Sequence, residues 1–282
     1  MQLRVTSLRT IKNGNRRTAW TPAQLPSLAL WLDAADASTI TLNGSNVSQW
    51  NDKSGNGKNA IQPAGANQPT YSLTGLNNKP ALYFGANKYL YFSGRAIDFG
   101  ADRRTTIAVV VSTSTAGGMV LSQAGGIASG WSPGNFVYYF AATTGGVQTG
   151  NFFGRVQYGG GWVNGNINAV DGQPHIHVFL DGGLTTTPKE PYVDGTLSTK
   201  NTFAYADYSN RANQLYTMIG GGIANSGDGV KDLNGYIPEI ICFNSAISTD
   251  DRQKLEGYLA WKWGLAANLP AGHPYKTTPP LV

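Results

Sequence analysis

The chain has 282 residues, of which 41% are hydrophobic and 13% are charged, with 36 glycines and three glutamates. This composition favours many short strands joined by glycine-rich turns and argues against a helix-rich fold, since soluble domains average about 25% charged residues and about 7% glycine. Residues 1–27 hold five of the 21 basic side chains and no acidic one. The remaining residues contain 16 basic and 16 acidic side chains, so their formal charges sum to zero. A neutral body argues against a nucleic-acid-binding groove.

Residues 1–27 form a basic N-terminal arm. Its basic residues are Arg4, Arg9, Lys12, Arg16 and Arg17. A segment of this charge can dock on an acidic protein surface, nucleic acid or anionic lipid, and the alternative is a solvated tail. No long apolar run follows the basic positions, so we expect synthesis in the cytoplasm without a signal peptide and no insertion into a membrane.

Short apolar segments along the body predict β-strands. The first are residues 28–32 and 47–50, and residues 81–84 and 89–92 are separated by four residues, which predicts a hairpin. Residues 105–111 are apolar on both faces, as in a strand at the middle of a sandwich. Further predicted strands are 119–122, 136–140, 152–157, 175–180, 214–219 and 234–243, and residues 192–195 predict a turn that enters another strand.

Residues 248–264 predict one helix after the last strand. Ser248 can cap its first turn, with Asp251 three residues further on, and Gly264 can adopt the left-handed conformation that ends a helix. The apolar face consists of Leu255, Tyr258, Leu259 and Trp263. Cys242, the only cysteine, lies in an apolar run and is interpreted as a buried hydrophobic residue rather than a nucleophile.

The order and spacing of several sequence blocks resemble a family of bacterial and phage proteins with a laminin-G-like, concanavalin A-like jelly roll. The blocks include LALWLDAADASTI, VSQWNDKSGNGKNAIQ, KPALYFGANKYLYF, TTIAVVVST, YVDGTLS, IGGGIANSGDGVKDLNGYIPEIICFNSAIS and LEGYLAWKWGLAANLPAGHPY. The resemblance covers residues 28–276, and residues 277–282 are read as a Pro-rich tail. It implies an all-β, two-sheet antiparallel sandwich with one C-terminal helix and an extended N-terminal arm.

The resemblance also implies functions. Many members bind glycans at loops or on a concave sheet, and those without a signal peptide resemble virion proteins. Glucanases with this fold carry two glutamates flanking an aspartate on one strand. Here Glu190, Glu239 and Glu256 lie far apart in the sequence, so we expect no enzymatic activity.

Metal binding has two candidate patterns. His175 and His177 have a spacing that can bind zinc, but a third ligand is missing nearby, so they are interpreted as two half-exposed polar residues. Some members of the resembled family hold calcium at a loop, for which Asp52 and Asp228 are the available side chains. The alternative is that these aspartates bond their own backbone, as is common in such turns.

Aromatic residues in Gly- or Asn-rich loops are candidates for glycan contact. They are Trp131, Tyr158, Trp162, Tyr205 and Tyr208. Rings of this type can stack on a sugar beside polar donors and acceptors. The alternative is that they anchor their own loops or an oligomer contact, because five other tryptophans are expected to serve packing. Those are Trp20, Trp31, Trp50, Trp261 and Trp263.

Taken together, these features predict a non-enzymatic virion protein of a tailed bacteriophage. The basic arm would dock on other virion proteins, and the sandwich would be displayed as a head decoration or a tail or baseplate attachment protein that contacts a host glycan. An oligomer within the assembly is expected, with no cofactor other than calcium. The alternatives are a stand-alone bacterial carbohydrate-binding lectin and, less favoured by the glutamates, a glucanase-like glycosidase.

Overall fold

The computed structural model describes residues 18–97, 104–113, 117–124, 136–141, 151–156, 162–182, 188–198, 216–221 and 232–282. The strands of the first half are β1 (Leu28–Asp33), β2 (Ile40–Asn43), β3 (Asn46–Trp50), β4 (Ala60–Ile61), β5 (Thr70–Leu76), β6 (Lys79–Phe84), β7 (Leu90–Ser93), β8 (Arg104–Thr113) and β9 (Gly117–Ala124). Those of the second half are β10 (Phe136–Ala141), β11 (Asn151–Val156), β12 (Trp162–Asn168), β13 (Pro174–Gly182), β14 (Lys189–Val193), β15 (Thr196–Leu197), β16 (Tyr216–Ile219) and β17 (Gly235–Phe243). The helix is α1 (Thr249–Trp263), and short 3-10 turns are η1 (Pro22–Gln24), η2 (Ala37–Thr39), η3 (Gly65–Asn67) and η5 (Ala266–Asn268).

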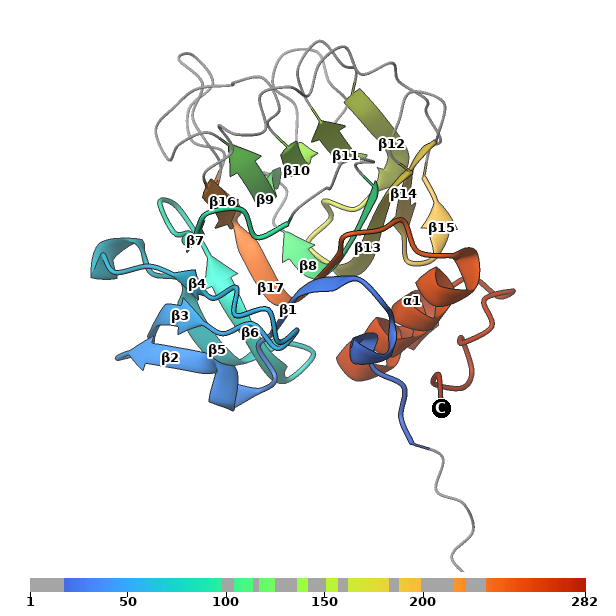
Figure 1. The fold of residues 1–282 in the computed structure, drawn as a ribbon, viewed down its shortest axis with the longest axis horizontal. Helices are drawn as coiled ribbons and strands as arrows, with labels where there is room; N and C mark the ends of the chain where they lie inside the picture. The colour runs from blue at the N-terminus through green and yellow to red at the C-terminus, as the bar shows by residue number, and fades with distance from the viewer. Residues whose placement is uncertain are drawn as a thin grey trace, which may run out of the picture.

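The strands form two antiparallel layers (Figure 1). In the first layer, β17 pairs with β8 on one edge and with both β1 and β6 on the other, and β13, β14 and β15 continue outward from β8. In the second layer, β7, β16, β9, β10, β11 and β12 pair in that order. Strands β3, β4 and β5 connect the two layers at one side. The predicted two-sheet sandwich with one C-terminal helix is therefore confirmed.

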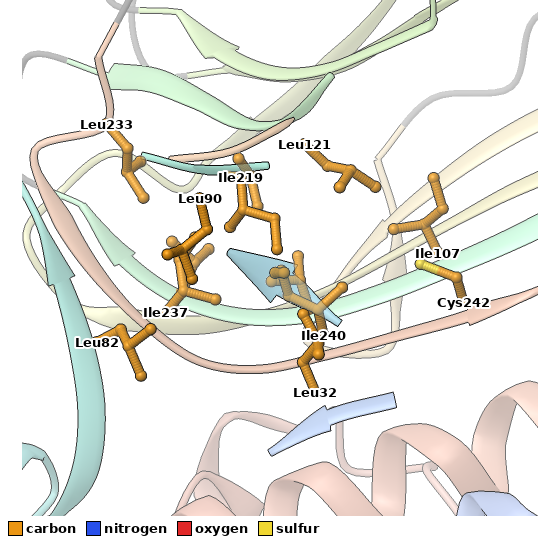
Figure 2. Close-up of a cluster of buried hydrophobic side chains, with 14 of the residues drawn as sticks. Leu32, Leu82, Leu90, Ile107, Leu121, Ile219, Leu233, Ile237, Ile240 and Cys242 are labelled. Atoms are coloured by element: carbon orange, nitrogen blue, oxygen red, sulfur yellow. The ribbon is translucent and has the colours of Figure 1, made fainter. Parts of the chain in front are cut away.

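A hydrophobic core fills the space between the layers (Figure 2). It includes Leu90, Leu121 and Ile219 from the second layer and Ile107, Ile240 and Cys242 from the first. Cys242 is fully buried in this core, as predicted, and burial raises the pKa of its thiol.

A second hydrophobic cluster lies on the outer face of the first layer, beneath α1. Ile241 and Phe243 of β17 point into it, whereas their neighbours Ile240 and Cys242 point into the inter-layer core. This alternation buries both faces of β17, because successive side chains of a strand point to opposite faces. Apart from Glu239, strand β17 therefore consists mainly of apolar residues.

Helix α1 has the ends that the sequence predicts. The Ser248 hydroxyl accepts a hydrogen bond from the backbone N–H of Asp251 at 3.1 Å, and Gly264 has a φ of 73°. Leu255, Leu259 and Trp263 are buried against the sheet. The helix is thus specified by local capping at both ends and held by an apolar face.

The predicted hairpin between residues 81–84 and 89–92 is wrong. Strand β6 pairs with β5 and β17 in the first layer, whereas β7 pairs with β16 and β4. The chain therefore crosses from one layer to the other between these strands. A short connection can join two strands of one hairpin or two strands in different layers. Burial of Phe84 and Leu90 on facing layers favours the second arrangement.

The described ends of the chain lie together beside α1 (Figure 1). Ala19 forms a β-bridge with Leu281, and the N–H of Trp20 donates to the carbonyl of Pro280 at 3.2 Å. Trp20 packs edge-on against Tyr258 of α1, with ring centroids 6.1 Å apart. Residues 18–20 are thus fixed to the sandwich, and the five basic residues that precede them lie outside the described residues. None of the helices among the described residues is long and apolar enough to span a membrane.

Candidate functional site

Of the five predicted glycan-contact residues, one lies in a described strand. Trp131, Tyr158, Tyr205 and Tyr208 lie outside the described residues, and Trp162 is the first residue of β12. The register pairs Tyr216 with Ala124, Phe136 with Val156, and Arg155 with Trp162. These strand ends therefore lie side by side.

The register has a direct consequence for the predicted aromatic residues. Residues 125–135, which contain Trp131, begin and end at this edge, and so do residues 157–161, which contain Tyr158. Residues 199–215, which contain Tyr205 and Tyr208, lead into the same edge at Tyr216. Five strand ends at one end of the sandwich thus adjoin three separate segments that contain candidate residues. We call this place the aromatic end.

Packing roles of the tryptophans are mostly as predicted. Trp20, Trp31, Trp50 and Trp263 are buried. Trp261 is wrongly assigned, because 40% of it is exposed on the outer side of α1, where its indole N–H donates to the carbonyl of Tyr275 at 2.8 Å.

The Asp52 loop is closed by its own hydrogen bonds. Oδ1 of Asp52 accepts from the N–H groups of Trp31 and Ser54 at 2.9 and 2.8 Å. Oδ2 accepts from the Ser54 hydroxyl at 2.7 Å and from the N–H of Lys58 at 3.1 Å. A calcium ion would have to displace these donors, so Asp52 fits a backbone-bonding role better than a metal ligand. Asp228 lies outside the described residues, and within the described ranges no three His, Cys, Asp or Glu side chains form a metal cluster.

The three glutamates have separate structural partners. Glu239 is fully buried among the indole N–H groups of Trp31 and Trp263. Glu256 is fully buried against Arg252 and His273 of α1 and the C-terminal segment, and Glu190 accepts from the Tyr192 hydroxyl at 2.8 Å. These three side chains do not form the facing pair that glycoside hydrolysis requires.

The reading of His175 and His177 as two half-exposed residues is wrong for His177. His177 is fully buried, because the inward face of β13 looks into the sandwich rather than into water. Burial lowers the pKa of His177 well below its usual value, and the charge of His175 acts in the same direction.

His175 is clamped between two carboxylates. Its Nδ1 lies 2.6 Å from Oδ2 of Asp194, and its Nε2 lies 3.1 Å from Oδ1 of Asp171. Burial lowers the pKa of His175, but the hydrogen bonds and charges of Asp194 and Asp171 outweigh it and raise the pKa above its usual value. The imidazole therefore holds the β12–β13 segment to the turn between β14 and β15.

This clamp forms one wall of a pocket of about 470 Å³, which we call the His175 pocket. The lining residues are Asn77, Asp171, Gln173, Pro174, His175, Asp194, Gly264, Leu265 and Asn268. They come from the β5–β6 turn, the β12–β13 connection, the start of β13, the β14–β15 turn and the residues after α1. The sequence does not reveal this site, because Asp171-Gly172 and Asp194-Gly195 are ordinary turn dipeptides.

Replacing His175 with glutamine should change how stability depends on pH. The folded-state pKa of His175 is raised, so its stabilising contribution is complete below the unfolded value of about 6.5 and is lost as pH rises through the folded pKa. His177 acts in the opposite sense, because its depressed pKa costs stability as pH falls below about 6.5. In urea unfolding across pH 5–9, the wild type should lose stability toward the alkaline side, and His175→Gln should lack that loss while keeping the acid-side decline. An unchanged alkaline limb in the variant would contradict the clamp.

The sequence matches no protein-family model and no curated protein. The fold is similar to the binding domain of Paraclostridial mosquitocidal protein 1, with a TM-score of 0.56 and 9% identity over 82% of this chain and 52% of that one. It is also similar to a structure of botulinum neurotoxin type C that concerns two ganglioside molecules, with a TM-score of 0.50 and 9% identity over 83% of this chain and 51% of that one.

A third similar structure is Trypanosoma rangeli sialidase in complex with sialic acid, with a TM-score of 0.51 and 13% identity over 88% of this chain and 36% of that one. The chain spans about half the length, or less, of these three structures. At these identities the likeness establishes a shared sandwich fold.

Proposed function

We propose that the protein is a non-enzymatic carbohydrate-binding protein displayed on the virion of a tailed bacteriophage. In this proposal the aromatic end contacts a host glycan, and the basic arm docks on other virion proteins. The observation that carries the glycan-binding part is the convergence of strand ends beside Trp162, where three segments with candidate aromatic residues begin or end. Gangliosides and sialic acid, named for two proteins of the same fold, belong to the same ligand class.

The chemistry of the candidate residues supports a sugar ligand. Tyrosine and tryptophan present an apolar ring with a polar group, which suits the mixed CH and OH surface of a saccharide. The segments that hold them are rich in Gly, Asn and Ser, whose backbone and amide groups donate and accept hydrogen bonds to hydroxyls.

Replacing Trp131 or Trp162 with alanine should weaken glycan binding at least about tenfold, which corresponds to about 1.4 kcal/mol per lost stacking contact. The measurement is a glycan array followed by calorimetric titration of the best ligand. Trp261→Ala is the matched control, because Trp261 is an exposed tryptophan on α1 that no proposed contact uses. An array without hits, or equal affinity in Trp131→Ala, Trp162→Ala and the control, would contradict the proposal.

Deleting residues 2–17 should abolish attachment to the particle while leaving the sandwich folded. The deletion stops before Thr18, because residues 18–20 pair with the C-terminal segment and Trp20 packs on α1. Copurification with particles and thermal unfolding should be compared for the deletion and for a variant with all five arm cations changed to glutamine. Normal assembly of both would refute arm docking, and glycan binding by a protein that never associates with particles would favour the lectin alternative.

A further inference from the structure

The His175 pocket is preorganised by hydrogen bonds within the protein. Oδ1 of Asp194 accepts from the N–H of Ile176 at 2.8 Å, and Asn77 donates to the carbonyl of Trp263 at 2.8 Å. Asn268 donates to the carbonyl of Pro174 at 3.3 Å. These contacts hold the side chains of Asn77, Asp194 and Asn268 in place before any ligand arrives, which reduces the ordering cost of binding.

Several polar groups of the pocket keep hydrogen-bonding capacity. Within the part of the chain that the structure describes, the side-chain amide of Gln173 forms no hydrogen bond, and the Oδ1 atoms of Asn77 and Asn268 accept none. Oδ2 of Asp171 likewise accepts none from the described residues, since its hydrogen bonds go to Oδ1. The pocket therefore offers one amide donor group and several acceptors, as a hydroxyl-rich ligand requires.

The charge of the pocket disfavours anions. Its lining holds the two carboxylates of Asp171 and Asp194 and the single imidazole of His175, with no lysine or arginine. The C-terminal end of α1 also faces it through Gly264 and Leu265, and this end of a helix carries partial negative charge. A carboxylate or phosphate would be repelled, whereas a neutral ligand would not.

From this combination we propose that the His175 pocket binds a neutral saccharide unit. The hydroxyl groups would bond Gln173, Asn77, Asn268 and Asp171, and the CH face of the ring would lie on Pro174 or Leu265. The volume of about 470 Å³ lies within the roughly 300–1,000 Å³ of small-ligand sites.

The site is separate from the aromatic end. Trp162 begins β12, whereas Asp171 follows the other end of that seven-residue strand, and such a strand spans about 20 Å. The two sites can therefore be tested independently, and the pocket proposal does not rest on the proposed glycan contact at the aromatic end.

The test is a titration of the full-length protein followed by two-dimensional amide NMR. The neutral probes are maltose, cellobiose and lactose, with glucosamine as a cationic probe and N-acetylneuraminic acid as an anionic one. We expect at least one neutral disaccharide to shift the side-chain amide signals of Gln173 and Asn268. Binding should weaken at least fivefold in Gln173→Ala and in Asn77→Ser, and Trp261→Ala, which changes an exposed tryptophan outside both proposed sites, should leave it unchanged.

The outcomes separate the two proposals. Loss of disaccharide binding in Trp162→Ala, with Gln173→Ala unaffected, would place the sugar at the aromatic end and overturn the pocket proposal. Binding of glucosamine without any neutral disaccharide would show a cation site and would also overturn it, as would the absence of any shift at Gln173 and Asn268. Thermal unfolding of each variant checks that a lost signal does not reflect a lost fold.

Discussion

Replacing Glu239 with alanine is expected to lower the free energy of unfolding by about 3–5 kcal/mol, as when one partner of a buried ion pair is removed. Oε1 of Glu239 accepts from the Trp31 indole at 2.7 Å and the Tyr258 hydroxyl at 3.0 Å. Oε2 accepts from the Trp263 indole at 2.5 Å and lies 2.9 Å from Nζ of Lys262. Alanine would leave all four donors without this acceptor.

The position of Glu239 explains the size of the expected loss. The carboxylate joins β17 to β1 through Trp31 and to α1 through three of its donors. Burial raises the pKa of Glu239, and the charge of Lys262 acts in the opposite direction. The network thus fastens the helix to the sheet.

Glu239→Gln is the matched variant. Glutamine keeps the volume and one acceptor oxygen, but it removes the charge that faces Lys262. The free energy of unfolding of Glu239→Gln should therefore lie between those of the wild type and Glu239→Ala. Urea unfolding at pH 7 measures both variants. A loss below about 1 kcal/mol in Glu239→Ala would contradict the assignment of the carboxylate as the centre of the network.

Replacing Gly220 with alanine is expected to destabilise the protein by at least about 3 kcal/mol, from backbone strain and overpacking together. Gly220 has a φ of +78°, and a Cβ built there would lie 1.9 Å from Cδ1 of Phe84. Phe84 is fully buried in the inter-layer core and cannot move away freely. The end of β16 therefore approaches β6 so closely that only glycine fits.

Gly44→Ala separates the two causes. Gly44 has a φ of +62°, but an added Cβ would meet nothing within 4 Å, so this variant reports the backbone strain alone. The difference in unfolding free energy between Gly220→Ala and Gly44→Ala then measures the clash with Phe84. Equal losses in the two variants would refute the close approach, and Gly220→Ala combined with Phe84→Leu should recover part of the lost stability.

The elements that sequence predicts well are those specified by neighbouring residues. The helix cap at Ser248 and the stop at Gly264 each depend on residues within a few positions of one another. The pairing of β6 and β7 depends instead on distant strands, and the hairpin prediction failed there. A short connection does not reveal whether the next strand stays in its layer.

The candidate sites could likewise be predicted from the sequence only in part. Aromatic residues in glycine-rich segments can be found by inspection, but the register of β9 to β12 and β16 shows that the segments share one end of a sheet. The His175 pocket could not have been found from sequence, because Asn77, Asp194 and Asn268 are brought together from three separate turns.

Composition and local hydrogen bonding suffice to predict the strand-rich sandwich, the capped terminal helix and the concentration of positive charge in the first 27 residues. The role of Glu239 as a structural acceptor emerges from the folded structure alone, because its partner Trp31 is 208 residues away. The folded structure also decided that His177 is buried while His175 lines a pocket: the two side chains share one face of β13, and that face is covered differently at the start of the strand and in its interior. Such long-range burial is set by the packing of the whole chain, and no local pattern encodes it.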